Sequence, residues 1–245
     1  MNEVIQLMRN HRSIRKFKDE ALSQETINTL VTAAQSASTS SYVQAYSIIG
    51  ITDPEIKHQL REISGQSYVE HNGHLFVFIA DFNRHAMLGQ HLNQPVDDYF
   101  GTTESFIVGT VDAALASQNM AVAAESMGLG ICYIGSLRNN MHKVIDLLQL
   151  PEHTYPLFGI VVGVPDNEGS QKERLPRKVV YHENTYQPFD YADYETYDAS
   201  TADYYSKRTN GARNDKWSEQ VIGMLSNKAR LDVDDVVKQQ GFLKQ

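Results

Sequence analysis

The chain has 245 residues, 41% of them hydrophobic, and 30 acidic against 22 basic side chains give a formal net charge of −8. This composition is typical of one soluble globular domain or two small ones, and its acidity argues against a broad nucleic-acid surface. The single cysteine, Cys132, excludes an internal disulfide, a CxxC zinc ribbon and thioredoxin-type chemistry. The longest uninterrupted apolar runs, 75–80 and 156–164, are shorter than the roughly 18–20 residues of a membrane span, and residues 1–10 lack a signal-peptide pattern. We therefore expect a cytoplasmic protein without a membrane segment.

Hydrophobic periodicity divides the first two thirds of the chain into helices and strands. Ser23 is a good N-cap, Pro54 lies at the start of a helix, and Gly128 is suited to end one. Because this alternation lacks strict βαβ regularity, an α+β fold is favoured over a doubly wound sheet. The predicted helices are 3–9, 24–37, one opening at 53–54, 104–127 and 139–150, and the predicted strands are 46–51, 74–81, 129–134 and 157–164.

The predicted helix 104–127 is apolar nearly all round, with few charges, among them Asp112 and Glu125. A helix of this kind belongs at the centre of the fold. The two carboxylates are too far apart along one helix to suggest a glycosidase pair.

The composition changes after Pro165. Seven of the 13 tyrosines lie between Tyr181 and Tyr205 among polar residues, which indicates a surface extension rather than a core element. Two further helices are predicted, 215–229 with Trp217, the only tryptophan, and 233–240. We expect this tail to wrap either its own domain or a partner subunit.

Three clusters hold 13 of the 22 basic side chains of this acidic protein, a pattern typical of an anionic ligand or an ion-pair network. Arginine pairs two oxygens of a phosphate or carboxylate at once, so such clusters suggest an anionic ligand, with a solvated charged face as the alternative. The first cluster also contains the compact donors His11 and Ser13. The clusters are Arg9, Arg12, Arg15, Lys16 and Lys18; Lys172, Arg174, Arg177 and Lys178; and Lys207, Arg208, Arg213 and Lys216.

Other chemistry-bearing patterns are weak. There is no P-loop, and the glycines of 128–135 do not have the G-x-G-x-x-G spacing of a Rossmann site. No metal site is predicted, because the histidines between His71 and His91 lack an HExxH pattern. The hydroxyls of 38–41 lack a G-x-S-x-G nucleophile elbow, and Cys132 in an apolar strand is expected to be inert.

Taken in order, the motifs resemble those of the flavoprotein nitroreductase superfamily, in its branch of NADPH-dependent, FMN-containing nitroreductases and flavin reductases. The resemblance extends from about residue 5 to about residue 242. It is carried by the motifs HRSIRKF (11–17), STSS (38–41) leading to Gln44, SII-x-ITD (47–53), ADFNRH (80–85), AAESMGLG (123–130), YIGSLRN (133–139), LP (150–151), PLFG (156–159) and RLP (174–176).

The resemblance implies a single nitroreductase-like domain over 1–245, with a mostly antiparallel central sheet surrounded by helices. It also implies a homodimer with FMN at the subunit interface, in which the extension from about 180 to 245 embraces the partner. Arg15 would lie toward N1 and O2 of the flavin ring and His11 near its phosphate. Ser136 stands where relatives often have glycine, and a side chain there requires an ordinary φ. The implied FMN-binding residues are His11, Arg12, Ser13, Arg15, Ser38, Thr39, Ser40, Ser41, Gln66, Tyr133, Ile134, Gly135, Ser136, Lys172 and Arg174.

The third basic cluster has its own implied role. Arg208 and Arg213 match positions that receive the 2′-phosphate of NADPH, so NADPH is expected to be preferred over NADH. The implied reaction is a two-electron, ping-pong reduction of nitro compounds, quinones or free flavin. No side chain is expected to act as a nucleophile, because the cofactor carries the chemistry. The alternatives are a dedicated FMN reductase, a disulfide reductase, or a non-catalytic flavin- or anion-binding module.

Overall fold

The computed structural model describes residues 2–188, 190–227 and 230–244, and the chain divides into two compact units. The first unit runs to Gly169 and includes the chain from Arg230 onward, whereas the second begins at Ser170 and ends before Arg230. The tail expected from about 180 to 245 is therefore shared between the units.

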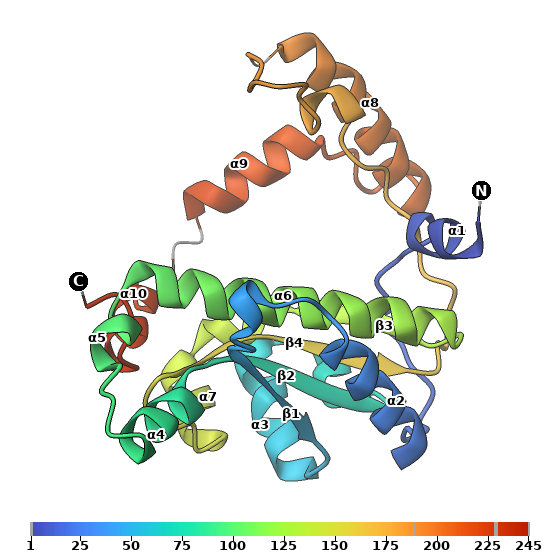
Figure 1. Cartoon of the computed structure of the whole chain (residues 1–245). Helices are drawn as coiled ribbons and strands as arrows, with labels where there is room; N and C mark the ends of the chain where they lie inside the picture. Colours follow the sequence, from blue (N-terminus) through green and yellow to red (C-terminus); the bar gives the residue numbers. More distant parts are fainter. Residues whose placement is uncertain (1, 189, 228–229, 245) are drawn as a thin grey trace. The chain divides into compact units, whose positions relative to one another are not determined.

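The core of the first unit is a four-stranded sheet in the order β1-β2-β4-β3 (Figure 1). Its strands are β1 (Tyr46–Ile51), β2 (His74–Asp81), β3 (Gly130–Ile134) and β4 (Thr154–Gly163). All three strand pairs are antiparallel, with Ile48 opposite Phe78 and Tyr133 opposite Ile160. The α+β class and the antiparallel character of the sheet are thus confirmed.

Helices cover both faces of this sheet. α2 (Gln24–Gln35) and α6 (Thr103–Ser126) contribute to the hydrophobic cluster that includes Phe76 and Phe78 of β2. α3 (Pro54–Ser64) contributes Leu60 to the cluster that includes Leu75 and Val77, the alternate residues of the same strand. Because successive strand residues point to opposite faces, β2 is buried on both sides. Figure 1 shows α6 and α3 on opposite sides of the sheet.

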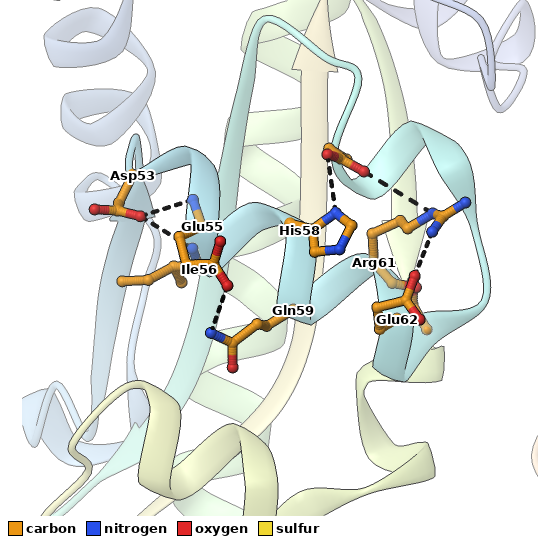
Figure 2. A network of polar contacts seen from close by, with 9 residues as sticks. Asp53, Glu55, Ile56, His58, Gln59, Arg61 and Glu62 are labelled. Atoms are coloured by element: carbon orange, nitrogen blue, oxygen red, sulfur yellow. Dashed lines mark hydrogen bonds and ion pairs between the residues drawn. The ribbon is translucent and has the colours of Figure 1, made fainter.

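Signals in the local sequence set several helix ends. Ser23 Oγ accepts the backbone N–H of Thr26 at 3.1 Å, and Gly128 has φ +75°, as its predicted role requires. At the start of α3 the carboxylate of Asp53 accepts the N–H groups of Glu55 and Ile56 at 2.8 and 3.0 Å (Figure 2). These ends were predictable because each depends on residues close together in the chain.

The outer surface of α3 is polar. His58 Nδ1 lies 3.2 Å from a carboxylate oxygen of Glu70, and Gln59 donates to Glu55 at 3.0 Å (Figure 2). These side chains are partnered with one another on the surface, and none of them is a predicted site residue.

The remaining helices of the first unit are shorter. α10 returns to the core, where Val236, Val237 and Phe242 are buried. α4 and α5 were not predicted, and the helix predicted at 139–150 is shorter in the structure, where α7 begins at Met141 and ends at Leu147. These elements are α1 (Glu3–Arg9), α4 (Asn83–His91), α5 (Asp97–Phe100), α7 (Met141–Leu147), α10 (Val233–Gln239), and the 3₁₀ turns η1 (Ser40–Tyr42), η2 (Ser67–Val69) and η3 (Gly135–Asn139).

By length and composition, α6 is the one helix among the described residues that is long and apolar enough to cross a membrane. Serines, threonines and Asp112 interrupt its apolar residues, so this helix contains no long uninterrupted apolar run. Ten of its 24 residues are buried in the first unit, including Asp112 itself. α6 is therefore the central core helix that its composition predicted.

The second unit contains η4 (Arg177–Val179), α8 (Tyr191–Arg208) and α9 (Trp217–Asn227). The tyrosine-rich region expected as a surface extension includes an 18-residue helix that was not predicted, and Tyr205 is the one buried residue of that helix. The rings of Tyr194 and Tyr197 lie 5.9 and 5.7 Å from that of Trp217, which packs α8 against α9. Residues 228–229, the predicted end of the helix 215–229, lie outside the described residues.

Candidate functional site

The segment after α1 lies beside strands β3 and β4. The Ile14 N–H donates to the carbonyl of Ile131 at 2.9 Å, and the Lys18 N–H donates to that of Val164 at 2.9 Å. The buried Ile14 side chain lies against Gly130, where a Cβ atom would come within 2.6 Å of Ile14 Cγ1. Gly130 therefore permits the close approach that fixes the segment.

These backbone hydrogen bonds place Ser13 and Arg15 next to Tyr68 and Cys132. Burial raises the pKa of the Cys132 thiol, and the neighbouring Arg15 charge and hydrogen bonds with Tyr68 and Ser13 offset part of that rise. Burial likewise raises the pKa of Tyr68, which hydrogen-bonds Arg15. Gln66 lies at the N-terminus of the same 3₁₀ turn as Tyr68. Ser13 and Arg15 are thus brought together beside Cys132 and Tyr68, and Gln66 lies two positions before Tyr68 in the chain.

His11 is held by the central helix. Its Nδ1 atom lies 2.6 Å from Glu125 Oε1, and the two side chains are 27% and 14% exposed. Glu125 was not predicted to take part in the site. Its position beside His11 gives this loop residue a fixed carboxylate partner.

The predicted loop 38–41 is tied to α6 by Asp112. Asp112 Oδ1 accepts the N–H of Ser40 at 2.8 Å, and Oδ2 accepts the N–H of Ala45 at 2.9 Å. The carboxylate is fully buried, so its charge is stabilised by these donors instead of water. The sequence signal was a carboxylate in the middle of an apolar helix, which must find polar partners, but spacing alone did not show where those partners lay.

The end of β3 carries another predicted segment, 133–136. The Tyr133 hydroxyl lies 3.3 Å from Ser117 Oγ and donates to Gln118 at 3.4 Å, both on α6. Ser136 is not among the positive-φ residues, so a side chain is tolerated there. Its hydroxyl oxygen is buried and has no hydrogen-bond partner among the described residues. A buried hydroxyl of this kind is suited to contact a bound molecule.

α6 connects these parts of the first unit. The loop 38–41 contacts it at Asp112, Tyr133 at Ser117, and His11 at Glu125, within a span of 13 positions. At 1.5 Å per residue this is roughly 20 Å of helix. The three predicted segments of this unit therefore lie along α6, and β3 contacts the first of them and contains part of the third.

Arg12 borders an open hollow of about 700 Å³ between α1, the end of α6 and the loop after β4. Three carboxylates, Glu125, Asp166 and Glu168, also line it. The mixed charge makes this hollow a poorer phosphate site than the arginine alone would suggest.

In the second unit, two adjacent tyrosines gather three of the four predicted cations. Lys172 donates to the Tyr205 hydroxyl at 3.0 Å, and the Arg213 guanidinium lies 4.5 Å from the centre of the Tyr205 ring. Arg208 donates to the Tyr204 hydroxyl at 3.2 Å. Burial raises the pKa of Tyr204, but hydrogen bonds with Ser170 and Arg208 outweigh it and leave that pKa below its usual value.

The fourth cation, Arg174, lines a neighbouring hollow of about 610 Å³ together with Lys172 and Trp217. Arg213 also donates to Asp215 at 2.6 Å. Aromatic side chains and a carboxylate thus give Lys172, Arg208 and Arg213 fixed contacts within the second unit.

The chain matches known proteins over its whole length. Residues 8–164 match the model of the "Nitroreductase family", and residues 172–245 match that of the "Nitroreductase family, C-terminal domain". An FMN reductase (NADPH) of Bacillus subtilis is 52% identical over 249 residues, covering all of both chains. An NADPH-dependent oxidoreductase of Staphylococcus saprophyticus is 49% identical over 98% of each chain.

Solved structures are equally similar. The NfrA1 nitroreductase of B. subtilis superposes with a TM-score of 0.97 at 51% identity, covering 99% of this chain and all of that one. The NADPH:FMN oxidoreductase of Vibrio harveyi, solved in complex with NAD⁺, gives a TM-score of 0.91 at 38% identity over all of both chains. Matches of this extent establish the family: the chain belongs to the nitroreductase family.

Proposed function

We propose that this chain is an NADPH-dependent, FMN-containing oxidoreductase that reduces nitro compounds, quinones or free flavin. The observation that carries the proposal is the convergence of 11–15, 38–41 and 133–136 on α6 and β3, in a member of the nitroreductase family. Relatives named for NADPH and FMN at 52% and 38% identity support the choice of both molecules.

The residues of the first unit fit a flavin. Arg15 places a guanidinium on the segment that is hydrogen-bonded to β3. The buried hydroxyl of Ser136 has no hydrogen-bond partner among the described residues and could therefore bond to the flavin. Bound FMN would supply the ring that accepts a hydride from NADPH and delivers two electrons to the acceptor. Arg15 would then stabilise negative charge on the reduced ring, and Ser38–Ser41 would contact the cofactor on its other side.

The cations of the second unit would bind phosphates. We assign Lys172 and Arg174 to the FMN phosphate and Arg208 and Arg213 to the 2′-phosphate of NADPH. Because Tyr204 and Tyr205 hold three of these side chains in place, little side-chain freedom is lost on binding.

We also propose that the protein works as a homodimer in the cytoplasm, with the second unit embracing the partner. Ile107, Val111 and Leu115 are spaced one helical turn apart on α6 and are 42–50% exposed. In the second unit, α9 exposes Ile222 and Leu225. Contiguous exposed apolar side chains of this kind are typical of an interface.

The proposal is tested by the visible spectrum of the purified protein and by anaerobic titration with NADPH and then NADH. We expect a bound flavin that NADPH bleaches faster than NADH and that an added acceptor reoxidises. A protein that neither contains nor binds FMN would refute the proposal, and a bound flavin that NADPH never reduces would indicate a non-catalytic module.

Two substitutions separate the proposed roles. Arg15→Ala should weaken FMN retention and slow flavin reduction. Arg208→Ala should raise the KM for NADPH and leave bound FMN unchanged. Arg61→Ala, which removes a partly exposed arginine of α3, is the matched control and should alter neither property. Equal loss of both properties in either site variant would contradict the assignment.

A dedicated FMN reductase is the second candidate, because the 52% identical relative from B. subtilis is named an FMN reductase (NADPH). Comparing kcat/KM for free FMN with that for a quinone and a nitroaromatic distinguishes it from a broad-acceptor enzyme.

A further inference from the structure

The loop 39–45 has a backbone that L-amino acids rarely adopt. Ser41, Tyr42 and Gln44 have φ values of 48°, 60° and 56°, so three non-glycine residues within four positions are in the left-handed region. Such a conformation persists only where its surroundings impose it. The surroundings of this loop therefore contain the groups that determine its shape.

Asp112 is the principal such group. Its two oxygens accept the N–H groups of Ser40 at 2.8 Å and Ala45 at 2.9 Å, which lie on either side of the three strained residues. The carboxylate is 0% exposed, and ionised acceptors make the stronger hydrogen bonds. Between Ser40 and Ala45, the carbonyl oxygen of Val43 lies 2.9 Å from His85 Nε2. One side chain of the core helix thus fixes both ends of the loop.

We propose that Asp112 is a positioning residue, whose buried carboxylate holds the loop 38–45 in the shape that presents Ser38–Ser41 to the flavin. This inference rests on the proposed function, since the flavin is the molecule that the loop would contact. Both oxygens are needed because each accepts a different N–H group. An asparagine would turn an NH₂ group toward one of these donors and would lose the charge.

The test compares Asp112→Asn with Glu104→Gln, which removes an exposed carboxylate from the first turn of the same helix. FMN is titrated into each apoprotein and followed by quenching of flavin fluorescence, with circular dichroism to verify folding. We expect the dissociation constant to rise by about tenfold or more in Asp112→Asn, as for the loss of a hydrogen bond to a charged group. The visible bands of the bound flavin should also shift, whereas Glu104→Gln should match the wild type.

A rescue variant separates positioning from general stability. Glycine adopts the left-handed region readily, so Gln44→Gly lowers the strain that Asp112 opposes. Gln44→Gly combined with Asp112→Asn should therefore recover part of the FMN affinity and the wild-type flavin spectrum. The inference would be overturned if Gln44→Gly recovered none of the FMN affinity lost in Asp112→Asn. It would also be overturned if Asp112→Asn bound FMN like the wild type.

A measurement on the unaltered protein covers the case in which Asp112→Asn does not fold. The amide protons of Ser40 and Ala45 should be protected from hydrogen exchange in the apoprotein and should stay so when FMN is added. Protection that arises only with FMN would contradict a preformed loop. Failure of the wild type to bind FMN would overturn the proposed function and this inference together, whereas normal FMN binding by Asp112→Asn overturns this inference alone.

Discussion

A buried histidine in the core makes the stability of this protein depend on pH in a way that can be calculated. His74, on β2, is 5% exposed, and its Nε2 atom has no hydrogen-bond partner among the described residues. Burial, reinforced by the positive charge of Lys57, lowers the pKa of His74 from 6.5 to about 4. The folded protein therefore binds a proton at this site less readily than the unfolded chain does.

The sign and size of the effect follow by linkage. Well above pH 6.5, His74 is neutral in both the folded and the unfolded state, so it does not change the free energy of unfolding with pH. As the pH falls from 6.5 toward 4 the unfolded chain takes up the proton first, so the free energy of unfolding decreases, and below about 4 the effect levels off. The fall in the pKa of His74 from 6.5 to about 4 corresponds to about 3 kcal/mol of unfolding free energy, since a tenfold change in proton affinity is about 1.4 kcal/mol.

The assay is urea unfolding followed by far-ultraviolet circular dichroism at several values between pH 7 and pH 4. His74→Gln should lose about 3 kcal/mol less over this interval than the wild type, because it has no proton to bind. His142→Gln, which removes an exposed histidine from α7, is the control and should follow the wild-type curve. If His74→Gln and the wild type lose stability in parallel, burial of His74 is not the source of the dependence.

Three further predictions concern the proposed flavin site and the proposed dimer interface. Gly130→Ala should destabilise the protein by about 1–3 kcal/mol in thermal unfolding and weaken FMN binding, because the added Cβ atom would overlap Ile14. The control Gly223→Ala adds a Cβ atom in open space on α9 and should be neutral or stabilising. Ser136→Ala should leave the stability of the apoprotein unchanged or raise it by about 1 kcal/mol while weakening FMN binding, so a destabilised apoprotein would argue against the unpaired hydroxyl. Val111→Glu should shift the protein from dimer to monomer in sedimentation, and an unchanged dimer would place the interface elsewhere.

The elements that the sequence predicted well are those with local causes. The strands at Tyr46–Ile51 and His74–Asp81 have the predicted bounds, since each is a short apolar run flanked by turn-forming residues. The start of α2 follows from the side chain of Ser23, and the end of α6 from the positive φ of Gly128. None of these features depends on a distant part of the chain.

The elements that were missed have distant causes. α8 buries only Tyr205 among its residues, so its sequence has no clear apolar face, and contacts with Trp217 and the cations of the same unit support it. The tyrosines therefore indicated a surface extension but not the helix within it. A helix stabilised by side chains on another segment cannot be recognised from its own periodicity.

The motifs of the site could be predicted from the sequence, but the carboxylates that hold these motifs in place could not. Residues 11–15, 38–41 and 133–136 could be found from the sequence because they resemble those of a known family. Asp112 and Glu125 could be recognised only as unusual charges in an apolar helix, because their partners are 67 to 114 residues away. Hydrogen bonding requires that a buried carboxylate have partners, but only the fold determines which ones.

The placement of these two carboxylates has a consequence for how the molecule tolerates change. An ordinary core helix could accept many apolar substitutions of similar volume, since dispersion and burial are not directional. In α6 the directional contacts at Asp112, Ser117 and Glu125 are interleaved with buried residues such as Ala113, Ala116 and Ala124. A rotation or shift of the helix by even part of a turn would misplace all three contacts at once. Packing of the small residues in α6 should therefore control FMN affinity as well as stability, so that Ala116→Val should weaken both, although its side chain makes none of the polar contacts described for the site.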